Sequence, residues 1–369
     1  QLIVDLTAWV SGGGEPHELT SVQREYLMQT RAMENGVPVV AADKVGVEQA
    51  SIVYCGRSYV IDPGGRVLAT LGPEEEGVLV HDVNLPGAPA PPVVRRPELY
   101  GALVEPTASL PVSAALDEAL VVRNESRRLA AVQAELPEGD ALVPFVERWC
   151  RLLATQDCDL VVFAAPALSG RPHELALVSR IAALSEALTI DICLTLRTGD
   201  GGALSRTAYL CSGGRVTLSH RQTHGAEIAP GDTPCPVVET RAGRAGVLIA
   251  EEGLVPEVAR SLMLRGAETL LWPARGLPFD LTLFARTRAD ENRCALALAC
   301  PPAEDGVTLV ASPQGQLVAS ALRTREMACH GQINRALAHW KDMAPGTHVV
   351  FGRRPETYGA LVEPVASEK

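Results

Sequence analysis

The amino-acid sequence predicts an α/β protein in which helices pack on layered β-sheets. Two observations support this prediction. Along residues 128–369, apolar runs of strand length alternate with longer runs of helical periodicity, and a twelve-residue segment near residue 100 returns near residue 360. Repeated alternation of strands and helices is typical of layered α/β folds. The alternation alone does not select one layered architecture.

The predicted elements follow one another through residues 128–369. Short apolar runs predict strands at 129–133, 160–163, 190–196, 247–250 and 269–272. Longer runs predict helices at 142–154, 175–188 and 255–266. The turn Ser212-Gly213-Gly214 predicts a hairpin, because glycines accept the backbone angles that tight hairpin turns need. Its strands are expected at 206–210 and 216–219.

The repeated segment is RRPELYGALVEP at 95–106, which returns as RRPETYGALVEP at 353–364 with eleven of twelve residues identical. Weaker matches pair residues 30–35 with 287–292, 63–69 with 313–319, and 1–4 with 268–271. A repeat of this kind indicates two related structural units. We therefore expect the C-terminal portion of a first domain at 1–108, a linker at 109–127 and a complete second domain at 128–369. The Arg-Arg pairs that open both copies are interpreted as structural ion pairs rather than an anion site.

The composition argues against some classes of function. The hydrophobic and charged fractions of the 369 residues, 47% and 21%, are those of an ordinary globular protein. The formal net charge is −11, so a nucleic-acid backbone would be repelled. No apolar run approaches the ~20 residues that span a bilayer, and no basic-then-apolar leader opens the sequence. A cytoplasmic location without a membrane partner is expected.

The nine cysteines are scattered along the chain. None forms a Cys-x-x-Cys pair or a Cys/His set at metal-ligand spacing, so neither a metal nor another cofactor is expected. Reduced thiols also fit a cytoplasmic protein. Five cysteines lie in or beside apolar runs, where a free thiol behaves as a small buried hydrophobe: Cys158, Cys193, Cys211, Cys294 and Cys300.

Four segments, in this order, resemble the carbon–nitrogen hydrolase (nitrilase) superfamily. The first resembles its opening strand, and the second the strand that normally ends in Pro-Glu. The third resembles the aromatic-Arg-Lys-x-His segment with its downstream Pro-Gly-Asp, and the fourth the nucleophile strand and the helix after it. In the same order, the four segments are LAAVQ at 129–133, DLVVFAAPALSG at 159–170, HRQTH at 220–224 with PGD at 230–232, and GVLIAEE at 246–252. Residues 1–108 resemble only later segments of the family.

The resemblance implies a four-layer α-β-β-α sandwich, two of which commonly pair into an eight-layer block. It also implies hydrolysis of amide or nitrile carbon–nitrogen bonds. In that chemistry a Glu acts as general base, a Cys thiolate attacks the carbon, and a Lys stabilises the tetrahedral intermediate. These roles require a proton acceptor, an activated nucleophile and a fixed charged donor, respectively.

At the three family positions this sequence has other residues. Ala165 stands at the Glu position, and its methyl group accepts no proton. Gln222 stands at the Lys position and donates a hydrogen bond without charge, and Ala250 stands at the Cys position and cannot attack carbon. The first copy offers no replacement, because the family's three positions precede the part that it matches. No competent catalytic set is therefore expected.

Glu227, Glu251 and His224 are candidate pocket residues. Glu227 lies where many family members keep an accessory glutamate, and the alternative is a solvated loop carboxylate. Glu251 and Glu252 could add negative charge to the pocket, but a pair that faces solvent or caps the next helix is the preferred interpretation. His220 and His224 are spaced i, i+4. The residues between them predict a loop or strand end rather than a helix, so a metal site is disfavoured.

Three hypotheses about function remain open. The first is a non-catalytic family member that serves as a scaffold or ligand-sensing domain in an assembly. The second is an enzyme, in which this chain is the rear portion of a tandem hydrolase whose front supplies a working Glu-Lys-Cys set. The third is new chemistry that uses Glu227 and His224. An incomplete first copy would expose apolar surface, so we expect a homo-oligomer or an intramolecular domain pair. A small-molecule ligand is a further candidate partner.

Overall fold

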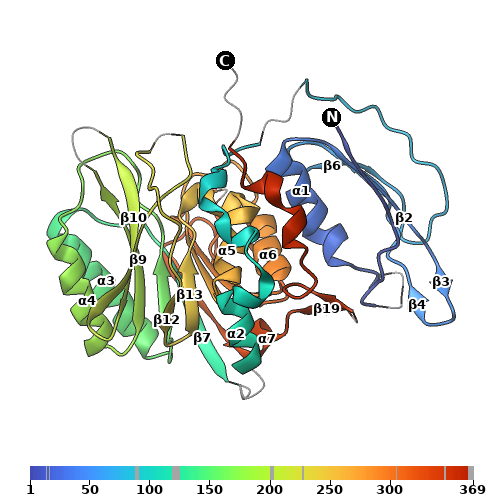
Figure 1. Cartoon of the computed structure of the whole chain (residues 1–369). Coiled ribbons are helices and arrows are strands. Elements are labelled where there is room, and N and C mark those ends of the chain that lie inside the picture. The colour runs from blue at the N-terminus through green and yellow to red at the C-terminus, as the bar shows by residue number, and fades with distance from the viewer. Residues whose placement is uncertain are drawn as a thin grey trace. The chain divides into compact units, whose positions relative to one another are not determined.

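Figure 1 shows the computed structural model of the chain. The structure describes all residues except 14, 16, 88–90, 119–124, 200–202, 227, 305, 345 and 365–369. The chain divides into two compact units, unit 1 from Gln1 to Val93 and unit 2 from Val94 to Lys369.

Unit 1 is built on one four-stranded sheet, in the order β1-β2-β5-β6. Strands β1 and β2 are parallel, and β5 and β6 continue the sheet antiparallel. Helix α1 packs on one side, where Ala32 meets Val39, Tyr59 and Ile61 in a small core. The bounds are β1 Ile3–Thr7, a short π-helix η1 Gln23–Leu27, α1 Met28–Asn35, β2 Val39–Asp43, β3 Val47–Glu48, β4 Ile52–Val53, β5 Tyr59–Ile61 and β6 Val67–Thr70.

Unit 2 contains two six-stranded sheets. The first has the order β11-β10-β9-β8-β7-β18, and the second β12-β13-β14-β15-β16-β17. The first comprises β7 Ser126–Gln133, β8 Leu160–Phe163, β9 Asp191–Thr198, β10 Ser205–Ser212, β11 Arg215–Arg221 and β18 Met327–Asn334. The second comprises β12 Val238–Thr240, β13 Gly243–Val247, β14 Thr269–Pro273, β15 Ala295–Ala299, β16 Leu309–Ala311 and β17 Leu317–Ser320. A small hairpin, β19 Asp342–Ala344 and β20 Thr347–His348, lies outside both sheets.

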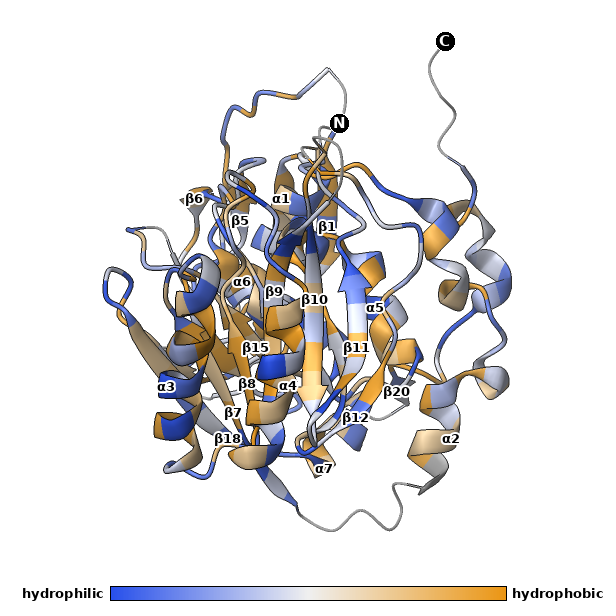
Figure 2. Ribbon diagram, turned by 90° about the vertical axis from the view of Figure 1, so that its left-hand side faces the viewer, coloured by the Kyte–Doolittle hydropathy of each residue, from blue (hydrophilic) through white to orange (hydrophobic). Residues whose placement is uncertain are grey.

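The two sheets of unit 2 pack face to face, and helices cover their outer sides. Strands β7, β8 and β14 to β16 meet between the sheets, and Figure 2 shows β8 and β15 as hydrophobic. Helices α3 and α4 cover the first sheet over a buried apolar cluster, while α5 and α6 cover the second. The helices are α3 Leu142–Ala154, α4 Ala176–Ala187, α5 Pro256–Leu264 and α6 Leu281–Asn292. Unit 2 therefore has the expected α-β-β-α layers.

The sheet of unit 1 has the same topology as part of unit 2. The order and directions of β1-β2-β5-β6 are those of β14-β15-β16-β17, with one parallel pair followed by two antiparallel pairs. Even the irregularity in the last pair recurs, between Val60 and Ile61 in unit 1 and between Val310 and Ala311 in unit 2. This match between the two sheets includes the segments that the repeat in the sequence had paired.

The division between the units differs from the expected domain boundaries. We expected a first domain at 1–108 and a linker at 109–127, but the structural division falls between Val93 and Val94. Residues after it form short 3-10 helices, including η2 Pro97–Leu99 and η3 Gly101–Leu103, and the helix α2 Pro111–Glu118. Both η3 and α2 pack on α5 of unit 2. The repeated segment therefore belongs to unit 2 because its apolar side chains are buried there.

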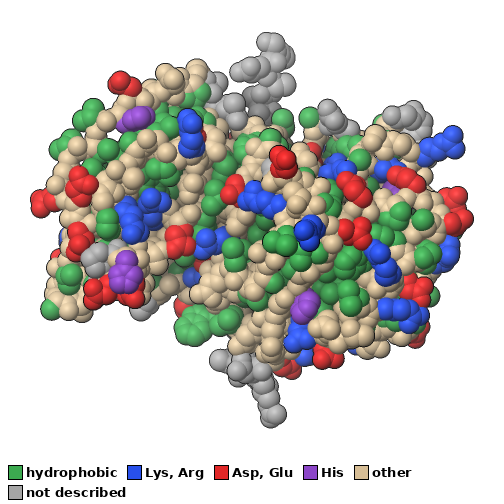
Figure 3. Space-filling view, turned by 180° about the vertical axis from the view of Figure 1, so that it is seen from behind, with side chains coloured by type: hydrophobic (Ala, Val, Ile, Leu, Met, Phe, Trp, Pro, Cys, Tyr) green, Lys and Arg blue, Asp and Glu red, His purple; other side chains and the backbone are tan. Residues whose placement is uncertain are grey.

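All nine cysteines are free and buried, which confirms the interpretation of the five in apolar runs as small core residues. Among the described residues, the helices are too short or too polar to cross a bilayer. Acidic and basic side chains are interspersed over the face that Figure 3 presents. On that face the acidic side chains do not form a continuous negatively charged patch.

Candidate functional site

Ala250 lies in a tight turn between β13 and α5. The strand expected at 247–250 ends at Val247, and Ala250 begins a 3-10 helix, η7 Ala250–Leu254. The strand prediction was therefore too long by three residues. Ala250 has φ 48°, in the left-handed region that residues with a Cβ atom rarely adopt. The apolar run continues past the strand because the turn itself is buried.

Two large side chains fix this turn. Trp272 in β14 donates from Nε1 to the carbonyl oxygen of Ala250 at 2.8 Å. Gly253 lies against the same indole so closely that a Cβ atom there would sit 2.0 Å from Trp272, so only glycine fits. The fully buried Arg288 donates to the carbonyl oxygens of Gly253 and Leu254 at 3.0 and 2.9 Å. These contacts hold the backbone of the turn in place. Ala250 itself carries no reactive group.

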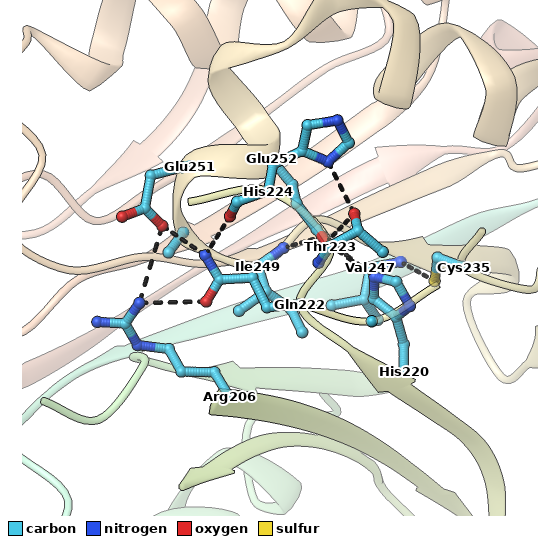
Figure 4. Close-up of polar contacts among 12 residues, drawn as sticks. Arg206, His220, Gln222, Thr223, His224, Cys235, Val247, Ile249, Glu251 and Glu252 are labelled. Atoms are coloured by element: carbon cyan, nitrogen blue, oxygen red, sulfur yellow. Dashed lines mark hydrogen bonds and ion pairs between the residues drawn. The ribbon is translucent and has the colours of Figure 1, made fainter. Parts of the chain in front are cut away.

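Gln222, Arg206 and Glu251 form a polar cluster beside the turn (Figure 4). Gln222, just beyond the end of β11, donates from Nε2 to Glu251 Oε2 at 2.5 Å and to the carbonyl oxygen of His224 at 2.6 Å. Arg206 in β10 donates to Gln222 Oε1 at 3.2 Å and lies 3.8 Å from Glu251 Oε2. Gln222 is fully buried, and Arg206 is nearly so. The Gln222 amide and the charged groups of Arg206 and Glu251 therefore provide one another's hydrogen-bond partners inside the protein.

The cluster brings the three expected positions to one place. Arg206 Nε donates to the carbonyl oxygen of Pro166 at 2.9 Å, and Pro166 follows Ala165 directly. Glu251, which follows Ala250, accepts from Gln222. Ala165 and Ala250 are both buried. The alignment of separate sequence segments thus corresponds to one region of unit 2.

A second network begins at the carboxylate of Glu252, which is buried completely. It lies 3.0 Å from Nε2 of His220, accepts from the backbone N–H and hydroxyl of Thr223, and accepts from the N–H of Ile249. Glu251 is only partly exposed and holds Gln222. The solvent-facing half of the preferred interpretation is wrong for Glu252, because the 3-10 turn points its carboxylate into the protein. The helix-capping half is confirmed for Glu252, which accepts from the N–H of Ile249, the residue that precedes η7.

The network continues to the repeated segment through His224. Thr223 Oγ1 donates to Glu252, so it accepts from Nδ1 of His224 at 2.7 Å. Nε2 of His224 is then an acceptor, and the Tyr100 hydroxyl donates to it at 2.8 Å. The same hydroxyl accepts from the backbone N–H of Arg96 at 3.0 Å. These bonds assign the neutral tautomer of His224 that carries hydrogen on Nδ1.

Burial and partners set the ionisation of this network. Burial is the largest cause that lowers the pKa of His224, and the guanidinium of Arg96 acts in the same direction against the opposing effect of Glu252, so that the pKa is about 4. Burial alone would raise the pKa of Glu252, but the charge and hydrogen bond of His220 and two backbone donors outweigh burial and lower it. A neutral His224 and an ionised Glu252 match the direction of every hydrogen bond in the network.

Cys235 is the thiol beside these residues in Figure 4. It lines a cavity of about 20 Å³ together with His220 and His224. Its Sγ donates to the carbonyl oxygen of Pro236 and accepts from the N–H of Val247, and burial raises its pKa. A protonated, buried thiol is a poor nucleophile. The surroundings of Cys235 therefore do not favour a thiolate nucleophile.

Glu227 lies outside the described residues. Within the ranges that the structure describes, no group of three or more His, Cys, Asp or Glu side chains is placed to hold a metal ion. His220 and His224 instead bind Glu252 and Tyr100.

Sequence reasoning missed Arg206 and Tyr100. The signal for Arg206 was a charged residue in the strand predicted at 206–210, where a buried charge usually has a partner. The signal for Tyr100 was its place in the repeated segment. Neither signal identifies the partner, which is distant in the sequence.

Comparison with known proteins gives a consistent assignment. A carbon–nitrogen hydrolase family model matches residues 3–89 and 128–341. The chain is 30% identical over 234 residues to "Hydrolase in pqqF 5'region" of Pseudomonas protegens, covering 56% of this chain and 81% of that protein. It is 30% identical over 182 residues to the deaminated glutathione amidase of Mus musculus, covering 42% of this chain and 55% of that enzyme.

A solved structure agrees at the level of the fold. Nit3 of Saccharomyces cerevisiae, a member of branch 10 of the nitrilase superfamily, superposes with a TM-score of 0.52 at 20% identity, over 58% of this chain and 92% of Nit3. The layers of unit 2 and the match to the family model over two stretches lead to the same conclusion. The chain belongs to the carbon–nitrogen hydrolase family.

Proposed function

We propose that this chain is a non-catalytic member of the carbon–nitrogen hydrolase family, which serves as a scaffold or ligand-binding domain in an assembly. The observation that carries the proposal is the residue at each expected catalytic position. Ala165, Gln222 and Ala250 are buried and supply no general base, no cation and no nucleophile. Support comes from Arg206, which bonds to the backbone after Ala165 and to Gln222, and from Glu251, which follows Ala250 and accepts from Gln222. Loss of one member of a cooperating set can lower turnover on the order of a million-fold.

The packing of the region also supports a structural role. Gln222 uses both ends of its amide, because its oxygen accepts from Arg206 and its nitrogen donates to Glu251 and the carbonyl of His224. Arg206 is tied to the backbone after Ala165. These side chains lie where the family's chemistry would need an accessible substrate. The cluster therefore connects β8, β10, β11 and the Ala250 turn through hydrogen bonds that the side chains satisfy among themselves.

The test is turnover on a panel of linear amides and nitriles, followed by mass spectrometry of the products. We expect no product above the level of a heat-denatured sample. Turnover that co-purifies with the chain and disappears in Cys235→Ser or Gln222→Ala would contradict the proposal. A stable fold for each variant, checked by circular dichroism, makes that result interpretable.

The topology of unit 1 favours a second candidate. Its sheet repeats β14 to β17 but has no counterpart of the first sheet among the described residues. In this candidate, a front segment with a working Glu-Lys-Cys set completes unit 1 into an amidase or nitrilase-type enzyme, and unit 2 is its companion domain. The coding sequence upstream of Gln1 tests it. A Pro-Glu strand, an Arg-Lys segment and an Ile-Cys-aromatic strand there would support this candidate, and their absence would exclude it.

A further inference from the structure

We propose that unit 2 binds a small organic carboxylate in a cavity on the outer side of its first sheet. The cavity has a volume of about 530 Å³ and is lined by residues of β9, β10 and β11 and of the segment that leads into α4. Its size is that of cavities that hold small organic molecules. The inference goes beyond the proposed function, since the binding does not depend on whether the chain is catalytic.

The cavity lies on the opposite face of the sheet from the polar cluster around Gln222. Thr207 in β10 pairs directly with Arg221 in β11, and Tyr209 lies two residues farther along β10. Successive residues of a strand point to opposite faces, so these three side chains share one face and Arg206 points to the other. Arg206 bonds to Gln222 there. Tyr209 packs against the apolar cluster under α3 and α4, so its face is the helix-covered side.

Arg221 is an exposed cation without a partner at the edge of the cavity. It is the last residue of β11, and Figure 2 shows the end of this strand as hydrophilic. Within the part of the chain that the structure describes, its guanidinium makes no hydrogen bond or ion pair. No acidic side chain is among the described residues that line the cavity. Because a guanidinium pairs with carboxylates and phosphates through parallel hydrogen bonds, the cavity favours an anion.

His173 is a neutral donor in the wall of the cavity. Its Nδ1 accepts from the N–H of Arg197 at 3.0 Å, so Nε2 carries the ring hydrogen. Burial lowers the pKa of His173, and the charge of Arg197 acts in the same direction, which keeps the ring neutral near pH 7. Nε2 is buried without a hydrogen-bond partner among the described residues, and Glu138 Oε2 lies 3.8 Å away. The ring therefore has a hydrogen to donate and no acceptor.

The unpartnered groups of the wall define the chemistry of the occupant. The Tyr209 hydroxyl also makes no hydrogen bond within the described ranges, so Tyr209, Arg221 and His173 all offer hydrogens. A carboxylate only accepts hydrogen bonds and complements such a wall. One cation beside neutral donors matches a singly charged anion better than a phosphate, which carries almost two negative charges near pH 7. The formal net charge of −11 also opposes a multiply charged ligand.

The remaining wall favours an apolar portion in the same ligand. Pro172 and Leu175 line the cavity, and Leu175 is 61% exposed, so its side chain offers apolar surface for contact. Leu175 is also the N-cap residue of α4 and provides no side-chain cap. The positive end of the helix dipole therefore lies beside the cavity and adds to the preference for an anion. The favoured ligand joins one carboxylate to a short aliphatic or aromatic group.

The experiment titrates the full chain with hexanoate and benzoate and follows binding by saturation-transfer NMR of the ligands. Hexanamide is the uncharged analogue of hexanoate. We expect saturable binding of the carboxylates and about tenfold weaker binding of hexanamide, because an amide lacks the charge that pairs with Arg221.

Matched variants test the location of the site. Arg221→Ala should weaken hexanoate binding by about tenfold or more, and Tyr209→Phe by about threefold, because the first removes a charged donor and the second a neutral one. The control Arg215→Ala removes another exposed arginine of β11, which does not line the cavity, and should leave the affinity unchanged. Thermal unfolding of Arg221→Ala should match that of the wild type, since the side chain has no partner in the fold.

Four results would overturn the proposal. They are a lack of saturable carboxylate binding, equal binding of hexanoate and hexanamide, full affinity in Arg221→Ala, and an equal loss of affinity in Arg215→Ala. Tighter binding of hexyl phosphate or inorganic phosphate than of hexanoate would replace the carboxylate assignment by a phosphate site. Each measurement reports binding rather than turnover, so this proposal can fail while the proposed function stands.

Discussion

At the scale of single residues, the turn at Ala250 keeps a backbone conformation that alanine does not favour. The left-handed φ of an L-residue costs roughly 1–2 kcal/mol. Here Trp272, Arg288 and the carboxylate of Glu252 all hold the turn in place. The surrounding contacts therefore hold Ala250 in a strained backbone conformation. Strain at a site without its reactive group is a stability defect that substitution can relieve.

Glycine at position 250 tests this view. Glycine adopts the left-handed region freely, which offsets the ~1 kcal/mol lost with a buried methyl group. We expect Ala250→Gly to change the free energy of unfolding by less than about 0.5 kcal/mol in urea denaturation. The matched control, Ala259→Gly, removes an equally buried methyl from the helix α5 and should cost about 2 kcal/mol. Equal losses in both variants would argue against strain at Ala250.

His224 predicts a specific dependence of stability on pH. Its folded-state pKa of about 4 lies below the ordinary value of 6.5, so the unfolded chain binds its proton first as the pH falls. The contribution of His224 is therefore complete above pH 6.5 and is lost between pH 6.5 and 4. We expect a loss of about 1 kcal/mol at pH 5.5 and about 2 kcal/mol at pH 4.5. The difference between wild type and His224→Gln in denaturation at each pH isolates this contribution.

At the scale of elements, the repeated segment provides an internal comparison of one motif in two settings. The same 3-10 pair is buried against α5 in the first copy and largely exposed in the second. Its conformation is unchanged. Burial therefore sets what each copy contributes to stability, since the local structure is the same.

Matched substitutions at Arg96 and Arg354 measure that contribution. Arg96→Ala removes hydrogen bonds to the carbonyl oxygens of Thr223 and Gly231 and should destabilise the chain by about 1–2 kcal/mol. Arg354→Ala removes an exposed guanidinium and should change the free energy of unfolding by less than about 0.5 kcal/mol. Chemical denaturation of both variants under identical conditions gives the comparison. A larger loss at Arg354 would mean that the second copy is covered in solution.

Most elements were predictable because their patterns are local. The helix expected at 142–154 is α3 with the same bounds, and the hairpin around Ser212 to Gly214 joins β10 and β11. The assignment of Ala165, Gln222 and Ala250 to family positions rests on the order of motifs and stays a prediction. The polar cluster was not predictable, because Arg206 finds its partners Pro166 and Gln222 in segments 40 and 16 residues away. Periodicity describes one segment at a time and carries no information about such pairs.

At the scale of the whole molecule, the two units differ in how completely their sheets are covered. In unit 2 each sheet has helices on one side and the other sheet on its second side. In unit 1 the sheet has α1 on one side, and Val4 and Leu6 are exposed on the other. The boundary near residue 93 was not predictable from the repeat, since the repeated segment that ends the first copy packs on unit 2.

The exposed apolar side of unit 1 predicts weak self-association of the isolated chain. We expect the light-scattering mass to rise with concentration and Leu6→Lys with Val80→Lys to reduce that rise, because charge opposes apolar contact. Leu322→Lys, at a position 64% exposed in unit 2, is the control and should have no effect. Association that is insensitive to Leu6 and Val80 would place the contact elsewhere.

The burial of every cysteine has a practical consequence. A thiol reagent cannot reach any of the nine side chains until the surrounding structure opens, so labelling rates in the folded protein report local opening. Cys55 lies in unit 1, and the other eight lie in unit 2. A single set of labelling kinetics, resolved by peptide mapping, would therefore time the opening of the two units separately without an introduced probe.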